Sequence, residues 1–224
     1  MRVKLHHEGV NILIVALIVL LAINIPLWVW GDKAVATTVS AVSIVVYLIA
    51  VNFFRSPRRT FHGNPVNAVV ASADGKVVAL EETFEDEYLH GPAVQISVFM
   101  HLFNVHANWF PVNGEVIHTC HHKGRFQAAW LPKSSTDNER STVVIRTPEG
   151  QLVVVRQIAG AVARRIVTYA QPGIEACIDD HLGFIKFGSR VDIFVPVGTD
   201  IMVKLGDHTT GGVTQVAKLN PGNK

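Results

Sequence analysis

The chain is poor in cysteine and in charge. Its 224 residues include only 2 cysteines, which is too few for a disulfide framework or a four-thiolate zinc site. Charged residues make up 17%, and the 20 Lys and Arg nearly balance the 18 Asp and Glu, for a formal net charge of +2. Nucleic-acid binding usually requires an excess of positive charge, so we expect no nucleic-acid partner.

Common cofactor motifs are also absent. The sequence contains no GxxxxGK[ST], no GxGxxG after a strand, no HExxH and no CxxC, so the nucleotide-binding and zinc-protease classes lose support. His118, Cys120, His121 and His122 offer imidazole and thiolate ligands, and alternating residues of a strand point to the same face. No second ligand pair follows at the spacing of a zinc finger, so we interpret them as solvated residues at a strand end and expect no metal.

The chain does have an excess of apolar sequence near its N-terminus. No charged residue lies between Val10 and Gly31, and this run is long enough to cross a hydrocarbon layer of about 30 Å. A second uncharged stretch, 34–54, follows a short turn that contains Asp32 and Lys33. A cleaved signal peptide is disfavoured because no A-x-A site follows the first run. We therefore predict a transmembrane helical hairpin in an anchor that spans residues 1–59.

Basic residues flank the outer ends of this hairpin, whereas its turn is balanced in charge. The positive-inside rule then puts both ends, and the body that follows, on the cytoplasmic face of the inner membrane. If the second stretch only lies in the interface instead of spanning the bilayer, the body lies on the far side. The same charges next to the second span are expected to attract anionic lipid, each by roughly 1 kcal/mol. The flanking residues are Arg2, Lys4, Arg55, Arg58 and Arg59.

The sequence pattern of residues 60–224 predicts an all-β or mostly β domain with one core, which is either a sandwich or barrel-like. Short apolar runs alternate with turn residues, and glycines at 75, 114, 150 and 198 stand where a turn favours positive φ. The segment 160–169 fits a strand or a short helix equally well. The expected strands are 68–71, 76–80, 94–100, 115–119, 142–147, 152–158, 184–187, 191–195, 201–205 and 212–219.

A few polar residues are embedded in this β pattern. By composition, Asp74 is a turn residue, His106 is a hydrogen-bonded core histidine, and Gly188 and Ser189 form a bend between two strands. These interpretations are compatible with a non-enzymatic, membrane-anchored β-module that binds a protein partner.

Several ordered blocks of sequence favour another function. They are FNVH at 103–106, PVNG at 111–114, TDNERST at 136–142, QIAG at 157–160 and GFIKFGSRVD at 183–192. With these blocks the body, from about residue 65 to 219, resembles the pyruvoyl-dependent phosphatidylserine decarboxylases in their short form. The resemblance implies an enzyme, a carboxy-lyase that converts phosphatidylserine to phosphatidylethanolamine and CO₂. A related decarboxylase that acts on a soluble amine is the alternative.

The resemblance also implies that the chain makes its own cofactor. Cleavage between Gly188 and Ser189 would give a heterodimer of a large chain, 1–188, and a small chain, 189–224. Ser189 would become a pyruvoyl group, whose ketone condenses with the substrate amine and accepts the electrons that decarboxylation releases. No metal is required. A membrane anchor suits this substrate, because each CH₂ of a lipid chain exposed to water costs about 0.8 kcal/mol.

Two further residues match the family's functional positions. Asp74 falls on the aspartate that orients or polarises a histidine during self-cleavage, and His106 falls on the histidine that protonates the substrate carbon after decarboxylation. Longer relatives have a second histidine three residues after the first, as the base for self-cleavage, where this chain has Trp109. The resemblance therefore predicts that Trp109→His is tolerated or speeds cleavage.

The missing histidine leaves the base for self-cleavage open. Either His106 serves both steps, or another residue is the base, with His121 and His122 as weaker candidates. Arg190 also departs from the longer relatives, which have threonine there. It either attracts the substrate's phosphate or carboxylate, or is an ordinary exposed charge at a strand edge.

Overall fold

The structure is a computed structural model that describes residues 3–125, 137–160, 165–186 and 189–220. It divides into two compact units, Met1–Arg58 and Arg59–Lys224. Each unit is described by itself below.

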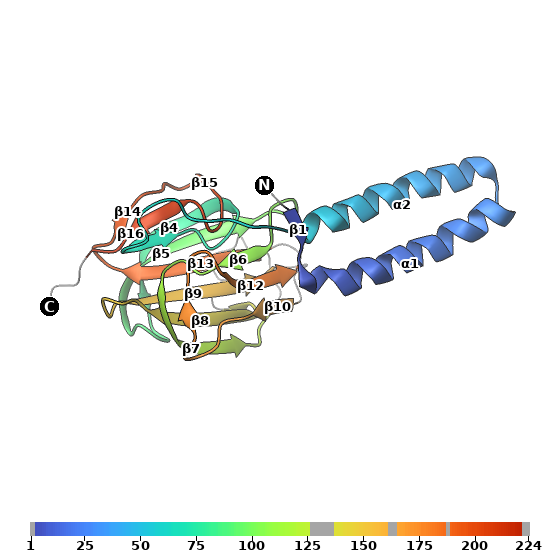
Figure 1. Cartoon of the computed structure of the whole chain (residues 1–224). Coiled ribbons are helices and arrows are strands. Elements are labelled where there is room, and N and C mark those ends of the chain that lie inside the picture. Colours follow the sequence, from blue (N-terminus) through green and yellow to red (C-terminus); the bar gives the residue numbers. More distant parts are fainter. Residues whose placement is uncertain (1–2, 126–136, 161–164, 187–188, 221–224) are drawn as a thin grey trace. The chain divides into compact units, whose positions relative to one another are not determined.

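The first unit is a helical hairpin (Figure 1), as the sequence predicts. Helix α1 spans His7–Trp30 and α2 spans Lys33–Phe53, and both are long and apolar enough to cross a membrane. The Asp32 carboxylate caps α2 by accepting from the backbone N–H of Ala34 and Val35. A short antiparallel pair, β1 (Val3–Leu5) and β2 (Arg55–Pro57), joins the two open ends of the hairpin.

A polar contact inside the apolar hairpin fixes how its helices pair. The Asn24 side-chain amide on α1 donates to Ser43 Oγ at 3.0 Å and accepts from Ser40 Oγ at 2.8 Å, both on α2. Trp28 Nε1 also donates to Ser40 Oγ at 3.0 Å. In lipid, where helices gain little from burying apolar surface against each other, such bonds set the register of a pair.

The second unit is built from antiparallel strands, which confirms the mostly β prediction. Eight strands form a curled main sheet in the order β11-β7-β8-β9-β13-β5-β4-β15, and two three-stranded sheets have the orders β10-β12-β6 and β14-β16-β3. The strands are β3 Ala68–Val70, β4 Gly75–Glu85, β5 Gly91–Met100, β6 Ala107–Trp109, β7 Gly114–His122, β8 Arg140–Arg146, β9 Leu152–Ala159, β10 Arg165–Thr168, β11 Glu175–Ala176, β12 His181–Lys186, β13 Ser189–Pro196, β14 Asp200–Ile201, β15 His208–Thr209 and β16 Gln215–Lys218.

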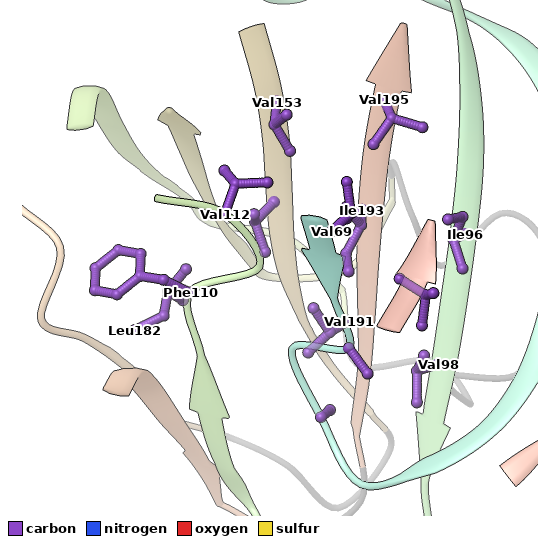
Figure 2. Close-up of a cluster of buried hydrophobic side chains, with 14 of the residues drawn as sticks. Val69, Ile96, Val98, Phe110, Val112, Val153, Leu182, Val191, Ile193 and Val195 are labelled. Atoms are coloured by element: carbon purple, nitrogen blue, oxygen red, sulfur yellow. The ribbon is translucent and has the colours of Figure 1, made fainter. Parts of the chain in front are cut away.

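One hydrophobic core fills the space between the main sheet and the smaller sheets. Strand β13 contributes Val191, Ile193 and Val195, which alternate along the strand and lie among the buried side chains of this core (Figure 2). The β13 residues between them face a second, smaller cluster on the other side of the sheet, which includes Phe194. Both faces of β13 are therefore buried. The first residue of this strand, Ser189, belongs to the candidate site described below.

The predicted strands all overlap observed ones, but several boundaries differ. The strand expected at 201–205 is only Asp200–Ile201, and the short strands β6, β11 and β15 were not expected. Within the ambiguous segment 160–169, Arg165–Thr168 is a strand, and residues 161–164 lie outside the described residues.

The turn glycines follow the prediction at three of four positions. Gly114, Gly150 and Gly198 have φ of 156°, 85° and 89°. Gly75 does not have positive φ, so the expectation was wrong there. This glycine is required by a close approach instead, because a Cβ at position 75 would lie 2.1 Å from the carbonyl oxygen of Phe99.

Candidate active site

Ser189 is the first residue of β13, a strand inside the main sheet. In the sheet register it pairs with Met100 at the end of β5 and with Ala159 at the end of β9. The side chain is 0% exposed and lies on the same face of the strand as Val191, toward the main core. Its Oγ lies 3.9 Å from the sulfur of Met100. The neighbouring Gly188, which the sequence singles out with Ser189, lies outside the described residues.

His106 lies beside the strand that leads to Ser189. Its backbone oxygen accepts from the N–H of Ile185 at 3.2 Å, near the end of β12, and only three residues separate Ile185 from Ser189. The imidazole is 0% exposed, and its Nδ1 lies 3.0 Å from the carbonyl oxygen of Asn104. Because a carbonyl only accepts hydrogen bonds, this contact requires the proton on Nδ1.

A chain of buried polar side chains continues from Met100 into the core. The Asn108 amide Nδ2 lies 3.7 Å from Met100 Sδ, and Gln157 Nε2 donates to Asn108 Oδ1 at 2.8 Å. Thr168 Oγ1 then lies 2.7 Å from Gln157 Oε1 and 2.7 Å from Ser141 Oγ. Each amide and hydroxyl in this chain has a partner, so the groups are held in fixed orientations.

Sequence reasoning missed Asn108 and gave Gln157 no role. The only signal for Asn108 in the sequence was its position two residues after His106. The contact between Asn108 and Gln157, by contrast, joins residues 49 positions apart and depends on the tertiary fold.

Asp74 has a different partner from the histidine that the resemblance implies. Both terminal nitrogens of Arg59 donate hydrogen bonds to the Asp74 carboxylate, with Nη2 2.9 Å from Oδ2. The backbone N–H of Gly211 also donates to Asp74 Oδ1, at 2.9 Å. The Arg59 guanidinium stacks on Trp109, with Cζ 4.6 Å from the ring centroid. Trp109 also contacts the His181 ring in an edge-on arrangement, with 5.0 Å between the two ring centroids.

This pairing changes the interpretation of Arg59. The sequence places it among the basic residues that flank the membrane span, but its side chain is only 6% exposed and is bound to Asp74. A role as a free charge for anionic lipid is therefore wrong for this residue.

Arg190 is buried within the main sheet. Its side chain is 2% exposed, with Nε 2.5 Å from Asp192 Oδ1 and Nη2 2.9 Å from Ser97 Oγ. The alternative of an exposed charge at a strand edge is therefore wrong. Because Arg190 directly follows Ser189 on β13, the two side chains point to opposite faces of the sheet. Substrate binding by Arg190 stays a prediction.

The histidines of β7 lie away from Ser189. His122 Nε2 lies 3.0 Å from the hydroxyl of Tyr88, on the face of the sheet that carries the smaller cluster. Burial raises the pKa of Tyr88 to about 12, with a further contribution from Cys120. Burial, and then the charge of Arg140, lower the pKa of His122 below its usual value.

The other possible base on β7 is engaged elsewhere. His121 Nε2 lies 3.4 Å from Glu139 Oε1. Strand β7 is three strands from β13 in the main sheet, a separation of about 14 Å at the usual strand spacing. The structure thus does not bring His121 or His122 to Ser189. Over the described ranges, no three His, Cys, Asp or Glu side chains gather as a metal site.

Comparison with known proteins assigns the family. A family model described as "Phosphatidylserine decarboxylase" matches residues 46–217. The chain belongs to the phosphatidylserine decarboxylase family. It is 55% identical over 220 residues to the phosphatidylserine decarboxylase proenzyme of Phocaeicola vulgatus, covering 97% of this chain and 96% of the relative. The proenzymes of Bacteroides thetaiotaomicron and Parabacteroides distasonis are 54% and 52% identical over 220 and 218 residues, each covering 97% of this chain and 96% and 99% of the relative.

Family membership confirms the resemblance found in the sequence and identifies the chain as an enzyme, a decarboxylase. The alternative of a non-enzymatic β-module is set aside. Within the family fold, Ser189, Met100, His106 and Asn108 form the candidate active site, and Arg59, Asp74 and Trp109 form a second buried cluster on the same β-domain.

Proposed function

We propose that this chain cleaves itself between Gly188 and Ser189 and then decarboxylates phosphatidylserine to phosphatidylethanolamine and CO₂ at residue 189. The observation that carries the proposal is the position of Ser189: a fully buried serine at the start of an inner strand, in a family whose relatives are named proenzymes. The interpretation of Ser189 as part of an exposed bend between two strands does not fit this burial.

Self-cleavage uses the chain's own atoms. Ser189 Oγ attacks the carbonyl carbon of Gly188, and the peptide C–N bond breaks to give an ester and a free amine on Ser189. A base then removes the Ser189 α-proton, and the bond between Ser189 Cβ and Oγ breaks, so that Gly188 leaves as a carboxylate that keeps this oxygen. Residue 189 is now a dehydroalanine. Water hydrolyses it, ammonia departs, and the small chain 189–224 begins with a pyruvoyl group.

The surroundings of Ser189 fit such a group. Among the described residues, the Oγ has a weak acceptor, the sulfur of Met100, beside it. Converting the CH₂OH of the serine to the methyl group of a pyruvoyl therefore forfeits no strong hydrogen bond to these residues. The Asn108 amide lies 3.7 Å from the same sulfur and is held there by Gln157. When formed, the pyruvoyl group supplies a ketone that condenses with the substrate amine and takes up the electrons released as CO₂ leaves.

His106 is the proton donor in this proposal. The bond of its Nδ1–H to the Asn104 carbonyl fixes the tautomer, so Nε2 is the ring atom that takes up and delivers a proton. Its place beside the end of β12 supports delivery of that proton to the substrate carbon at residue 189, after CO₂ has departed.

The two products would stay together after the cut. The small chain would contain β13 to β16. Strand β13 pairs with β5 and β9, β15 pairs with β4, and β16 pairs with β3, and all four of these partners lie in the large chain 1–188. These ladders support a non-covalent heterodimer. The hairpin α1–α2 would hold it at the inner membrane, with the body on the cytoplasmic face.

A lipid assay tests the function. The full chain, purified in detergent, is mixed with phosphatidylserine, and CO₂ and phosphatidylethanolamine are measured. We expect both products from the unsubstituted chain and neither from Ser189→Ala. Ser72→Ala is the matched control, because Ser72 is equally buried, and it should remain active. Turnover by Ser189→Ala contradicts the proposal, and preferential turnover of free serine or phosphoserine favours the soluble-amine alternative.

A further inference from the structure

We propose that Arg59 is a positioning residue for self-cleavage, which acts by holding the Asp74 carboxylate, with Trp109 as its platform. This inference rests on the proposed self-cleavage at Ser189 and adds to it a residue outside the candidate active site.

The geometry at Arg59 leaves its side chain little freedom. Both terminal nitrogens bind the two oxygens of Asp74, and Nη1 also donates to the carbonyl oxygen of Gly211 at 2.8 Å. The flat guanidinium lies on the Trp109 ring. A bidentate, stacked arginine fixes both the position and the rotation of a carboxylate, which a lysine or a single hydrogen bond does not.

Gly211 closes the cluster from the other side. It donates its N–H to Asp74 and accepts from Arg59, and a Cβ at this position would lie 2.6 Å from Cε3 of Trp109. Gly211 falls in the segment 189–224. The cluster therefore joins the chain on both sides of the proposed cut.

A short path connects this cluster to Ser189. Asp74 is followed by Gly75, whose backbone lies against the carbonyl of Phe99 on β5. The next residue of β5, Met100, pairs with Ser189 in the sheet register and touches its hydroxyl. When Asp74 loses its clamp, the turn at 73–75 is free to shift, and with it the end of β5 that positions Ser189 Oγ for attack.

Trp109 explains why an arginine takes this place. Where longer relatives have a histidine, this chain has an indole that binds a guanidinium by cation–π attraction. The carboxylate that would orient an imidazole is instead held by Arg59. Self-cleavage in this chain thus depends on Asp74 as a fixed anchor of the turn.

The test is a time course of self-cleavage. The full chain is synthesised without cells in the presence of detergent, and conversion of the 24.5 kDa precursor to the large product is followed on a gel. We expect Arg59→Met to slow conversion at least tenfold and Arg59→Lys to slow it less, because lysine keeps the charge but not the fork. If Arg59 acts through Asp74, the double variant Arg59→Met, Asp74→Asn is no slower than Asp74→Asn.

Arg156→Met is the matched control. Arg156 is 5% exposed, is paired with Glu85 and lies over the Phe194 ring at 4.8 Å, so its loss removes a comparable buried ion pair on the far face of the main sheet. A purely structural role for Arg59 predicts equal slowing in both methionine variants, which overturns the inference.

Three further outcomes of this experiment bear on the inference about Arg59. Cleavage of Arg59→Met at the unsubstituted rate overturns the inference and leaves the proposed function standing. An unsubstituted chain that stays whole overturns both. If Arg59→Met does not fold, as judged by circular dichroism, the comparison of Arg59→Lys with Arg156→Lys decides, and equal rates for these two reject the inference.

Discussion

The variant Trp109→His distinguishes two opposite predictions, one from the packing of Trp109 in the structure and one from the sequence pattern of longer relatives. The pattern of longer relatives predicts that Trp109→His is tolerated or speeds cleavage. The structure predicts the reverse, because the indole is 1% exposed and lies directly on Gly211 and Gly212, where added Cβ atoms would approach its ring to 2.6 and 2.9 Å. An imidazole is too small to fill this space or to support Arg59.

The cost follows from the packing. Full truncation of a buried tryptophan costs about 3–5 kcal/mol, and an imidazole retains roughly half of the contacts. Loss of the stacked guanidinium adds about 1 kcal/mol, for a total of about 3 kcal/mol. For a domain of this size that corresponds to a fall of roughly 6–12 °C in the unfolding midpoint. Slower self-cleavage should accompany it.

Thermal unfolding of the full chain in detergent, followed by far-ultraviolet circular dichroism, measures this effect. Both chains carry Ser189→Ala, so that cleavage does not complicate the transition. Trp30→His is the control, because that indole is 82% exposed and its loss should leave the midpoint unchanged. An unchanged midpoint in Trp109→His, together with faster cleavage in the Ser189 background, would refute the packing argument.

Three other outcomes follow from the structure. Asn24→Ala, which breaks the bond to Ser43, should weaken helix pairing by about 1 kcal/mol, measured as increased protease access to the hairpin in micelles; unchanged access counts against that bond. Glu85→Ala should lower the free energy of unfolding by about 3 kcal/mol in a denaturant titration, because it leaves Arg156 buried without its closest partner, and a loss under 1 kcal/mol contradicts this. Since folding lowers the pKa of His122, the unfolded state binds more protons near pH 6.5, so stability should fall from pH 7.5 to 5.5, and less in His122→Gln; equal slopes reject the assignment.

Local sequence was sufficient for the features that depend on neighbours along the chain. The uncharged runs gave the hairpin, because length and apolarity alone decide whether a helix can cross a membrane. Alternation and turn residues gave the longer strands of the body. The start of β13 at Ser189 lay two residues before the predicted strand, because pairing with β5 and β9 extends it.

Contacts between residues far apart in the sequence could not be predicted from local patterns. Arg59 is one of three arginines that follow the second apolar helix, so its neighbours in the sequence indicate a lipid-facing charge. Its actual partners, Asp74 and Gly211, are 15 and 152 positions away. In the same way β6 is only three residues long, and its assignment as a strand depends on pairing with β12. Without that pairing, nothing in the sequence brings Asn108 to Met100.

Mass spectrometry of the purified full chain is the most direct test of self-cleavage to a pyruvoyl enzyme. We expect two species, residues 1–188 and residues 189–224. The smaller one should be lighter than the serine-terminated peptide by one ammonia, and it should carry a ketone that carbonyl reagents label. An active enzyme of one intact 24.5 kDa chain, or a small chain that begins with an unmodified serine, would contradict this expectation.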